Sequence, residues 1–143
     1  MTWDEIVNEI ALQGGYVPSL HPKAFDELQG LLRRDMPVAK MVAAAIVKVC
    51  KNPLPQDMGG VGRRLGKRKE TGDLRPLLYV KLKGAGIRIV YALNHSTAED
   101  GSERTNKSLT IAVISKREDM EAYLEALKRK PDLLADWPEE WAK

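Results

Sequence analysis

The chain has 143 residues, of which 43% are hydrophobic and 30% are charged, with a formal net charge of +3. This composition is typical of one globular domain, here residues 1–143, and no stretch approaches the roughly 20 apolar residues of a membrane span. The lone cysteine, Cys50, excludes an internal disulfide, and the acidic N-terminus does not resemble a signal peptide, so we expect a cytoplasmic protein. The only histidines are His21 and His95, so we expect no metal site.

The N-terminal segment is predicted to form a helix and a short strand. Thr2 and Glu5 match a capping box, and apolar residues at helical spacing continue to a Gly-Gly pair, so residues 1–15 form an N-terminal helix outside the main pattern. The segment 16–20 is predicted to be an edge strand, because Pro18 excludes a central position.

Two further helices are predicted to form an αα-hairpin. The first begins at Pro22, and the break at residues 35–37 starts the second. Apolar residues recur at helical spacing in both, namely Phe25, Leu28, Leu31 and Leu32, then Val38, Met41, Val42, Ala45, Ile46 and Val49. We expect these stripes to cover one face of a sheet, with Cys50 as a small core residue.

The segment 52–76 is rich in Pro, Gly and basic residues and is predicted to be mostly loop. Its glycines do not match a phosphate-binding loop, because Val61 and Arg68 stand where that motif requires Gly and Ser or Thr. We therefore expect no nucleotide cofactor. From Val61 to Ala92 the chain carries nine Lys and Arg against two acids. Such a zone attracts a polyanion, although a solvated surface has the same composition.

Residues 78–93 are predicted to form a β-hairpin around a short Gly-containing loop. Pairing Leu82 with Ile87 gathers the apolar residues on one face, whereas a slip of one residue mixes the faces. The same register sets Lys81 directly opposite Arg88. Like charges in that position are destabilising, so the pair either extends into solvent or holds an anion.

The last third of the chain contains a loop, a strand and a helix. Residues 94–107 are polar and predicted to be a mobile loop, and 108–115 is predicted to be an interior strand. A capping box at Ser115–Glu118 starts a helix that ends at Pro131, and residues 131–143 form an acidic tail. The buried stripe of this helix is predicted to comprise Met120, Tyr123, Leu124 and Leu127.

The hairpin Tyr79–Tyr91, together with Ile114–Glu118 and Tyr123, resembles the RelE branch of the RelE/ParE toxin superfamily over about residues 16–130. The resemblance implies an α+β fold, in which a small twisted antiparallel sheet packs against an N-terminal αα-hairpin and a C-terminal helix. It also implies a toxin of a type II toxin–antitoxin system, a metal-independent and ribosome-dependent mRNA endoribonuclease that inhibits translation. Its partners would be a cognate antitoxin, the ribosome and mRNA, with no small-molecule cofactor.

The resemblance also assigns roles to individual residues. Lys81 would contact the phosphate or transfer a proton, and Arg88 would hold the scissile phosphate. Arg117 would add a second guanidinium at the strand–helix junction, where helical N–H groups also favour an anion, and Tyr123 would stack on or orient the substrate. Tyr79 departs from the family, whose best-known members carry lysine there. The expected RNA-binding residues are Arg63, Arg64, Lys67, Arg68, Tyr79, Lys83 and Lys116.

The chemistry follows from the residue types as well. An RNA 2′-OH attacks the adjacent phosphate once its proton is removed and the developing negative charge is stabilised, as two arginines and a lysine can do. Two alternatives stay open: a ParE-like toxin that inhibits gyrase without nuclease activity, and a nonenzymatic nucleic-acid-binding regulator of RelE-like fold. The ParE branch does not rely on the Lys/Arg/Tyr set, whereas Tyr79 favours the regulator.

Overall fold

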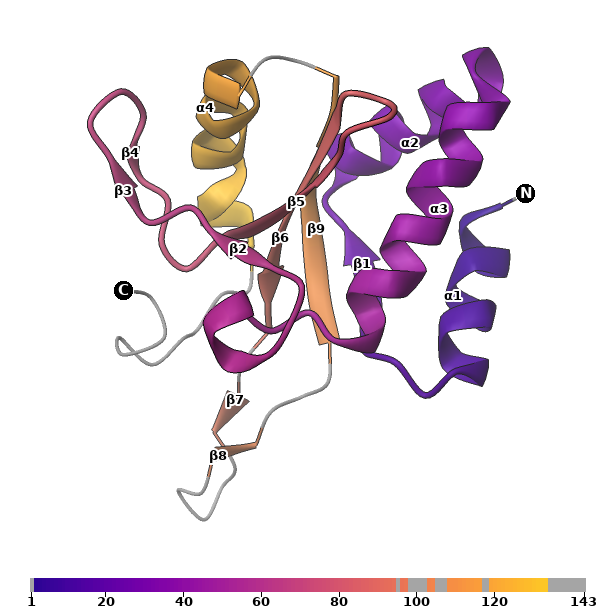
Figure 1. Ribbon diagram of the computed structural model, residues 1–143, viewed down its shortest axis with the longest axis horizontal. Coiled ribbons are helices and arrows are strands. Elements are labelled where there is room, and N and C mark those ends of the chain that lie inside the picture. Colours follow the sequence, from indigo (N-terminus) through magenta and orange to yellow (C-terminus); the bar gives the residue numbers. More distant parts are fainter. Residues whose placement is uncertain (1, 95, 98–102, 105–107, 117–118, 134–143) are drawn as a thin grey trace.

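A five-stranded sheet runs through the middle of the molecule and carries helices on both faces (Figure 1). The computed structural model describes residues 2–94, 96–97, 103–104, 108–116 and 119–133. The strands, in their order across the sheet, are β1 (Val17–Leu20), β9 (Ser108–Ser115), β6 (Ile87–Leu93), β5 (Leu78–Leu82) and β2 (Arg63–Arg64). The helices are α1 (Trp3–Leu12), α2 (Pro22–Arg34), α3 (Met36–Lys51) and α4 (Asp119–Arg129). The α+β class predicted from the sequence is confirmed.

The remaining short elements of the described residues are η1 (Gln56–Met58), β3 (Lys67–Arg68), β4 (Gly72–Asp73), β7 (Ser96–Thr97), β8 (Glu103–Arg104) and η2 (Lys130–Asp132). Strands β3 and β4 pair with each other, as do β7 and β8. The prediction of a loop over 52–76 is thus wrong where β2, β3 and β4 form. Most of the predicted mobile loop 94–107 and of the acidic tail lies outside the described residues.

The β5–β6 hairpin has the register predicted from its alternating pattern. Leu82 pairs with Ile87, and Lys81 pairs with Arg88. Its apolar face packs against α1, α2 and α3, and its other face is turned toward α4. The register therefore decides which hairpin residues are available for a site.

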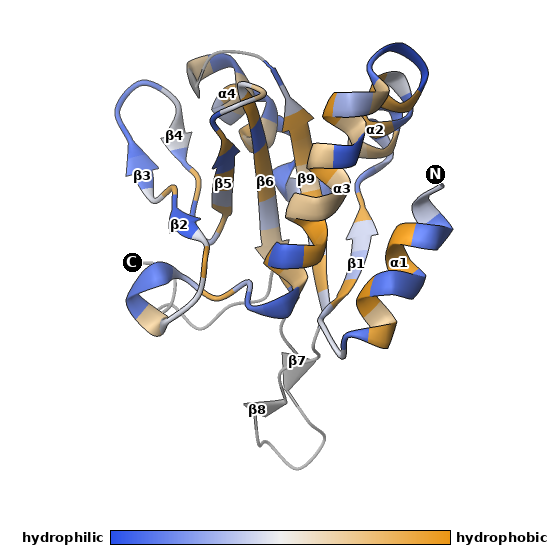
Figure 2. Cartoon of the chain, turned by 45° about the vertical axis from the view of Figure 1, so that its right-hand side comes forward, coloured by the Kyte–Doolittle hydropathy of each residue, from blue (hydrophilic) through white to orange (hydrophobic). Residues whose placement is uncertain are grey.

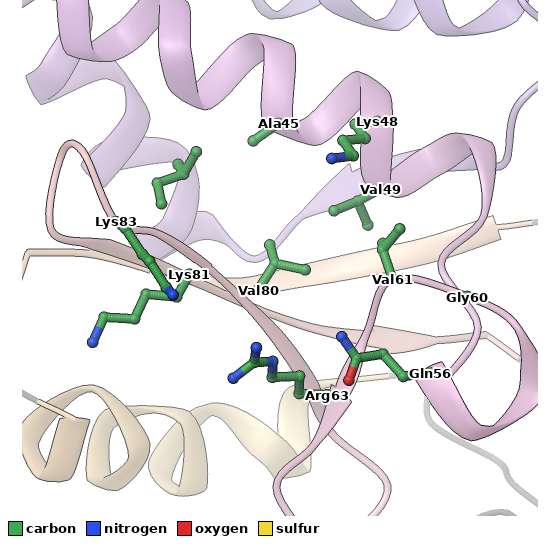
Figure 3. Close-up of a pocket in the computed structure, with 11 residues that line it drawn as sticks. Ala45, Lys48, Val49, Gln56, Gly60, Val61, Arg63, Val80, Lys81 and Lys83 are labelled. Carbon is green, nitrogen blue, oxygen red and sulfur yellow. The ribbon is translucent and has the colours of Figure 1, made fainter.

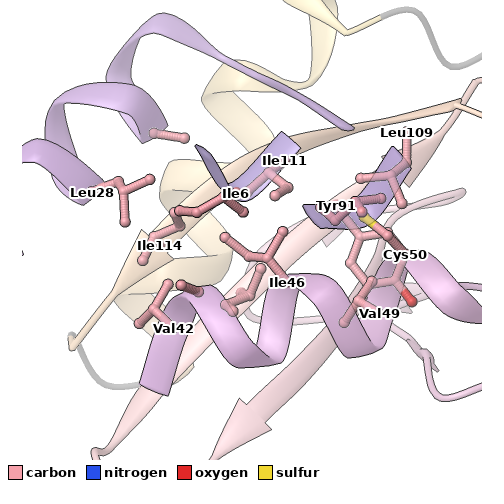
Figure 4. Packing of buried hydrophobic residues seen from close by; sticks show 14 of the residues in the cluster. Ile6, Leu28, Val42, Ile46, Val49, Cys50, Tyr91, Leu109, Ile111 and Ile114 are labelled. Atoms are coloured by element: carbon pink, nitrogen blue, oxygen red, sulfur yellow. The ribbon is translucent and has the colours of Figure 1, made fainter. Parts of the chain in front are cut away.

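The sheet separates two hydrophobic cores. The core beneath α1, α2 and α3 is shown in Figure 4 and includes Ile6, Leu28, Val42, Ile46, Cys50, Tyr91, Leu109, Ile111 and Ile114. The core beneath α4 includes Leu65, Leu74, Leu77, Val90, Ala92, Ala112, Val113, Ala122, Tyr123 and Ala126. Strands β6 and β9 contribute to both cores and are largely hydrophobic in Figure 2, whereas β2 and β3 are hydrophilic. The interior position predicted for residues 108–115 is confirmed.

The first three helices begin where the sequence predicts, and in each of them a side chain caps the first turn. Thr2, His21 and Asp35 each accept a hydrogen bond, of 3.1–3.3 Å, from a backbone N–H two or three residues later. These side chains satisfy N–H groups that lack a partner within the helix. The buried stripes are narrower than predicted, because Phe25 and Met41 are 39% and 40% exposed.

Strand β1 runs parallel to β9, which corrects the prediction of a purely antiparallel sheet. Val17 pairs with Ser108 and Leu20 with Ile111, whereas the other neighbouring strands of this sheet pair antiparallel. Pro18 lies in this edge strand, as its missing N–H requires. Alternation of side chains identifies a strand but not its direction, so the mixed sheet was not predictable from the pattern.

Helix α4 contacts the sheet through small residues. Ala122 and Ala126 are fully buried, whereas Met120 and Leu124 are 51% and 39% exposed. The predicted stripe is therefore wrong for Met120 and Leu124 and correct for Tyr123, which is buried. Alanines allow a helix to approach a sheet closely, and Met120 and Leu124 lie on the more exposed side of α4.

Two charged side chains cover the part of β9 that extends past β1. The pairing of β1 with β9 ends at Leu20 and Ile111. Further along, an oxygen of Glu27 on α2 accepts a hydrogen bond from the N–H of Ile114 at 3.1 Å. Arg129 on α4 donates to the carbonyl of Ala112 at 2.7 Å and to Glu27 at 2.7 Å. Side chains thus take the place of a neighbouring strand at this edge.

Arg129 is the centre of this network and is only 5% exposed. It also donates to Glu125 at 2.9 Å. Burial by itself would lower the pKa of Arg129, but the hydrogen bonds and charges of Glu27 and Glu125 raise it. The guanidinium is therefore charged, and it joins α2, the sheet and α4 by charge-assisted hydrogen bonds.

Tyr91 fixes the chain that leads from α3 to the edge strand β2. Its buried hydroxyl donates to the carbonyl of Pro53 at 2.8 Å. A Cβ at Gly62 would collide with that hydroxyl, so this position requires glycine. Burial raises the pKa of the Tyr91 phenol, which keeps the hydroxyl protonated as a donor.

The free energy of unfolding is expected to fall at alkaline pH, because burial raises the pKa of the Cys50 thiol to about 12. The unfolded chain releases this proton above about pH 8.5, while the native chain retains it. Each further pH unit then costs about 1.4 kcal/mol. Urea denaturation between about pH 9 and about pH 11 should show that the free energy of unfolding falls less steeply with pH in Cys50→Ala than in the wild type. Equal slopes would contradict the prediction.

Candidate nucleic-acid interface

Three neighbouring strands present a row of polar residues on the α4 side of the sheet. Lys81 on β5 lies opposite Arg88 on β6, and Arg88 lies opposite Ser115 on β9. Residues directly opposite on antiparallel strands have Cβ atoms about 5 Å apart, so Lys81 and Arg88 can reach the same ligand. Lys81 is exposed and Arg88 is half-buried. We call these three residues the polar row.

The strand–helix junction follows directly from the polar row. Ser115 is the last residue of β9, and the next residue, Lys116, is exposed. The Lys116 ammonium lies 3.4 Å from a carboxylate oxygen of Asp35, the residue that caps α3. Arg117 lies outside the described residues, so its role stays a prediction. The strand register nevertheless places Ser115, where the junction begins, in line with Lys81 and Arg88.

The ring of Tyr123 is buried beside Tyr79 on the same side of the sheet. It is 3% exposed, and its centroid lies 5.6 Å from that of Tyr79 at an interplanar angle of 58°. The Arg68 guanidinium lies 4.7 Å from the Tyr123 centroid, within the range of a cation–π interaction. Of the two roles implied for Tyr123, burial favours orienting neighbouring groups over stacking on a base.

The β3–β4 hairpin carries Arg68 and is anchored at both of its ends. The Arg68 guanidinium donates to the carbonyl of Leu65 at 3.2 Å. After β4, Arg75 forms two hydrogen bonds of 2.8 Å with the Asp73 carboxylate, and hydrogen bonding to Arg75 lowers the pKa of that carboxyl. Lys130 donates to the Asp73 carbonyl at 2.8 Å. The cation over Tyr123 thus belongs to a well-supported hairpin.

The structure brings only part of the expected RNA-binding set near the polar row. Arg63 and Lys83 are exposed and line a cavity at the edge of β5 that Lys81 also lines. Arg64 lies opposite Leu78, on the other face of the sheet, and pairs with an acid 3.1 Å away. Lys67 is exposed on the projecting β3–β4 hairpin (Figure 1).

Sequence patterns did not indicate two residues that line this cavity. Lys48 comes from α3 and Gln56 from η1 (Figure 3). Lys48 has the spacing of an ordinary solvent-exposed helical lysine, so no periodicity distinguishes it. Gln56 lies in a segment expected to be loop. Their position depends on the long-range contact between α3, η1 and the hairpin.

Two other features are absent from the described ranges, a metal-binding cluster and a membrane-spanning helix. No group of three or more His, Cys, Asp or Glu side chains in those ranges is placed to hold a metal ion. Among the helices of the same ranges, none combines the length and apolar character needed to cross a membrane.

Comparison with solved structures finds this fold in the E. coli toxin RelE, solved in the free state as a mutant with two arginines replaced by alanine. The match has a TM-score of 0.52 and 19% sequence identity, and covers 80% of this chain and 97% of the other. It establishes the RelE-like fold that the sequence predicted. No protein-family model matches the sequence, and a search of curated proteins found no match.

Proposed function

We propose that this chain is the toxin of a type II toxin–antitoxin system, a metal-independent endoribonuclease that cleaves mRNA on the ribosome and so inhibits translation. The observation that carries the proposal is the polar row, in which Lys81 and Arg88 lie directly opposite each other and in line with Ser115. Two cations in that position suit one phosphate group. The RelE-like fold adds support, since the matched structure is that of a toxin.

The proposed reaction uses the RNA's own 2′-OH. This hydroxyl loses its proton and forms a bond to the adjacent phosphorus, and the bond to the 5′-oxygen breaks as that oxygen gains a proton. Arg88 binds the non-bridging oxygens, for which the planar guanidinium fork is suited, and Arg117 supplies a second guanidinium. Lys81 contacts the phosphate or transfers a proton. Tyr123 orients these groups from its buried position.

The proposed partners follow from this reaction. The substrate is mRNA on the ribosome, the protein acts in the cytoplasm, and a cognate antitoxin neutralises it. No membrane or small-molecule cofactor takes part. The residues proposed to hold RNA are Arg63, Arg64, Lys67, Arg68, Tyr79, Lys83 and Lys116. Of these, Arg63, Arg68, Tyr79 and Lys83 have the most favourable positions, whereas Arg64 lies on the other face of the sheet from the polar row.

A nonenzymatic regulator that binds nucleic acid is the second candidate. It is favoured by Tyr79, which stands where the best-known RelE-branch members carry lysine and whose ring packs against Tyr123. A phenol at this position supplies one positive charge fewer to the phosphate. Such a regulator would bind RNA or DNA in a salt-dependent manner without cleaving it on translating ribosomes.

Mapping mRNA 5′ ends after induced expression tests the proposal. The wild type should arrest growth and produce new ends with codon periodicity, and Arg88→Ala should produce neither. Growth arrest without such ends would contradict the nuclease. If Arg88→Ala remained fully toxic and DNA breaks accumulated, the chain would be a ParE-like inhibitor of gyrase instead.

Tyr79→Lys is expected to strengthen binding to single-stranded RNA and to make it more salt-dependent. One additional phosphate contact increases the slope of log affinity against log salt by about 0.7. Tyr79→Phe is the matched control, because it keeps the ring against Tyr123 without adding charge. Fluorescence anisotropy over a salt series measures the slopes. Equal slopes for the two variants would show that this position does not face the RNA backbone.

A further inference from the structure

A cavity of about 380 Å³ lies between α3 and the edge of β5. Figure 3 shows Val49 and Val80 facing each other between the helix and the strand, with Lys48 on the helix side and Arg63 and Lys81 on the other side of the strand. This volume is within the range of small-molecule sites. The cavity combines an apolar floor with a rim of cations.

The rim carries four positive charges, namely Lys48 on α3, Arg63 on β2, Lys81 on β5 and Lys83 in the turn that follows β5. No acid is among the described residues that line the cavity, and none of these four cations forms an ion pair within the described part of the chain. Clustered like charges repel each other and raise the local concentration of anions. The composition of the rim therefore selects an anionic ligand.

The edge of β5 is open along the same cavity. Strand β2 pairs only with Tyr79 and Leu78, whereas β5 continues to Leu82. A strand edge beyond its partner presents unpaired N–H and C=O groups. Together with the Gln56 amide, these groups can bind the polar edge of a flat ligand whose faces contact the apolar floor.

We propose that the cavity binds one unpaired nucleotide of single-stranded RNA, next to the phosphate held at the polar row. Its base lies on the floor near Val80, with Gln56 at its edge, and Lys48 and Arg63 hold the flanking phosphates. Single-stranded RNA fits because its bases can be splayed out into pockets, which a duplex does not allow. Lys81 belongs to both sites, so the strand passes over the edge of β5. The link to cleavage rests on the proposed nuclease function.

Binding without ribosomes tests the cavity separately from cleavage. The probes are fluorescein-labelled single-stranded oligoribonucleotides, one for each of the four bases, titrated with the full chain at several salt concentrations. Lys48→Ala should weaken the binding of all four oligoribonucleotides by several-fold. It should also reduce the slope of log affinity against log salt by about 0.7. Lys40→Ala, an exposed lysine of the same helix that does not line the cavity, should change neither. Gln56→Ala should alter the ranking of the four bases.

The outcomes separate the two proposals. If the wild type binds RNA in this manner but cuts nothing on ribosomes, the cavity stands and the nuclease falls. If Lys48→Ala and Gln56→Ala bind RNA like Lys40→Ala while only Arg88→Ala loses cleavage, the cavity proposal is overturned and the nuclease stands. A labelled polyglutamate peptide is the second probe. Loss of its binding in Lys48→Ala with RNA binding unchanged would make the cavity a peptide site and also overturn the proposal.

Discussion

Arg88→Ala is expected to slow mRNA cleavage on purified ribosomes by about 10²–10³-fold, the usual effect of removing one preorganised donor from a transition state. Arg88 pairs with Lys81 on one side and Ser115 on the other, so it is the middle residue of the polar row. The fold should be retained, because the neighbouring residues of β6, and not Arg88 itself, belong to the hydrophobic cores. Single-turnover cleavage of one defined mRNA measures the rate.

Arg88→Lys distinguishes charge from geometry. A lysine keeps the positive charge but loses the bidentate grip on the phosphate, so its rate should fall between those of Arg88→Ala and the wild type. Lys40→Ala, which removes an exposed charge on α3 away from the polar row, should leave the rate unchanged. A wild-type rate in Arg88→Ala, with normal circular dichroism, would remove this residue from the site.

Arg129→Met is expected to lower the free energy of unfolding by about 3–5 kcal/mol, as found when one partner of a buried ion pair is removed. The substitution leaves the Glu27 carboxylate without its partner and the Ala112 carbonyl without its donor. It also removes the hydrogen bond to Glu125. Urea denaturation of the variant and the wild type measures the difference.

A double variant separates the effect of losing the ion pair from the effect of leaving one buried charge without a partner. Glu27→Leu combined with Arg129→Met removes both charges, so the double variant should be more stable than Arg129→Met alone. Arg33→Ala, an exposed arginine of α2, should change stability by less than about 0.5 kcal/mol. If Arg129→Met behaved like Arg33→Ala, the network would be of no consequence for stability.

The hairpin and the helix starts were predictable because local chemistry determines them. Only one register keeps Leu82 and Ile87 on the apolar face, and it brings Lys81 opposite Arg88 without further information. Capping residues such as Asp35 have a stereochemical role that does not depend on the rest of the fold. These local rules gave the centre of the candidate site.

Other features depend on contacts between distant parts of the chain. Two-residue strands such as β3 and β4 are too short to show an alternating pattern. The direction of β1 is fixed by its partner β9, and the exposure of Leu124 depends on α4 packing on the sheet through Ala122 and Ala126. Lys48 and Gln56 reach one cavity only after α3, η1 and the hairpin have packed together. No spacing in the sequence contains that information.

The parallel pairing of β1 with β9 has a consequence for biosynthesis. Val17 pairs with Ser108, so the first strand must wait for a partner made much later, and both cores need β9 before they can close. Pairing over such a separation raises contact order and slows folding. During synthesis, therefore, neither core can close until the ribosome has added Ser108–Ser115, and the helices made earlier lack the sheet on which they pack.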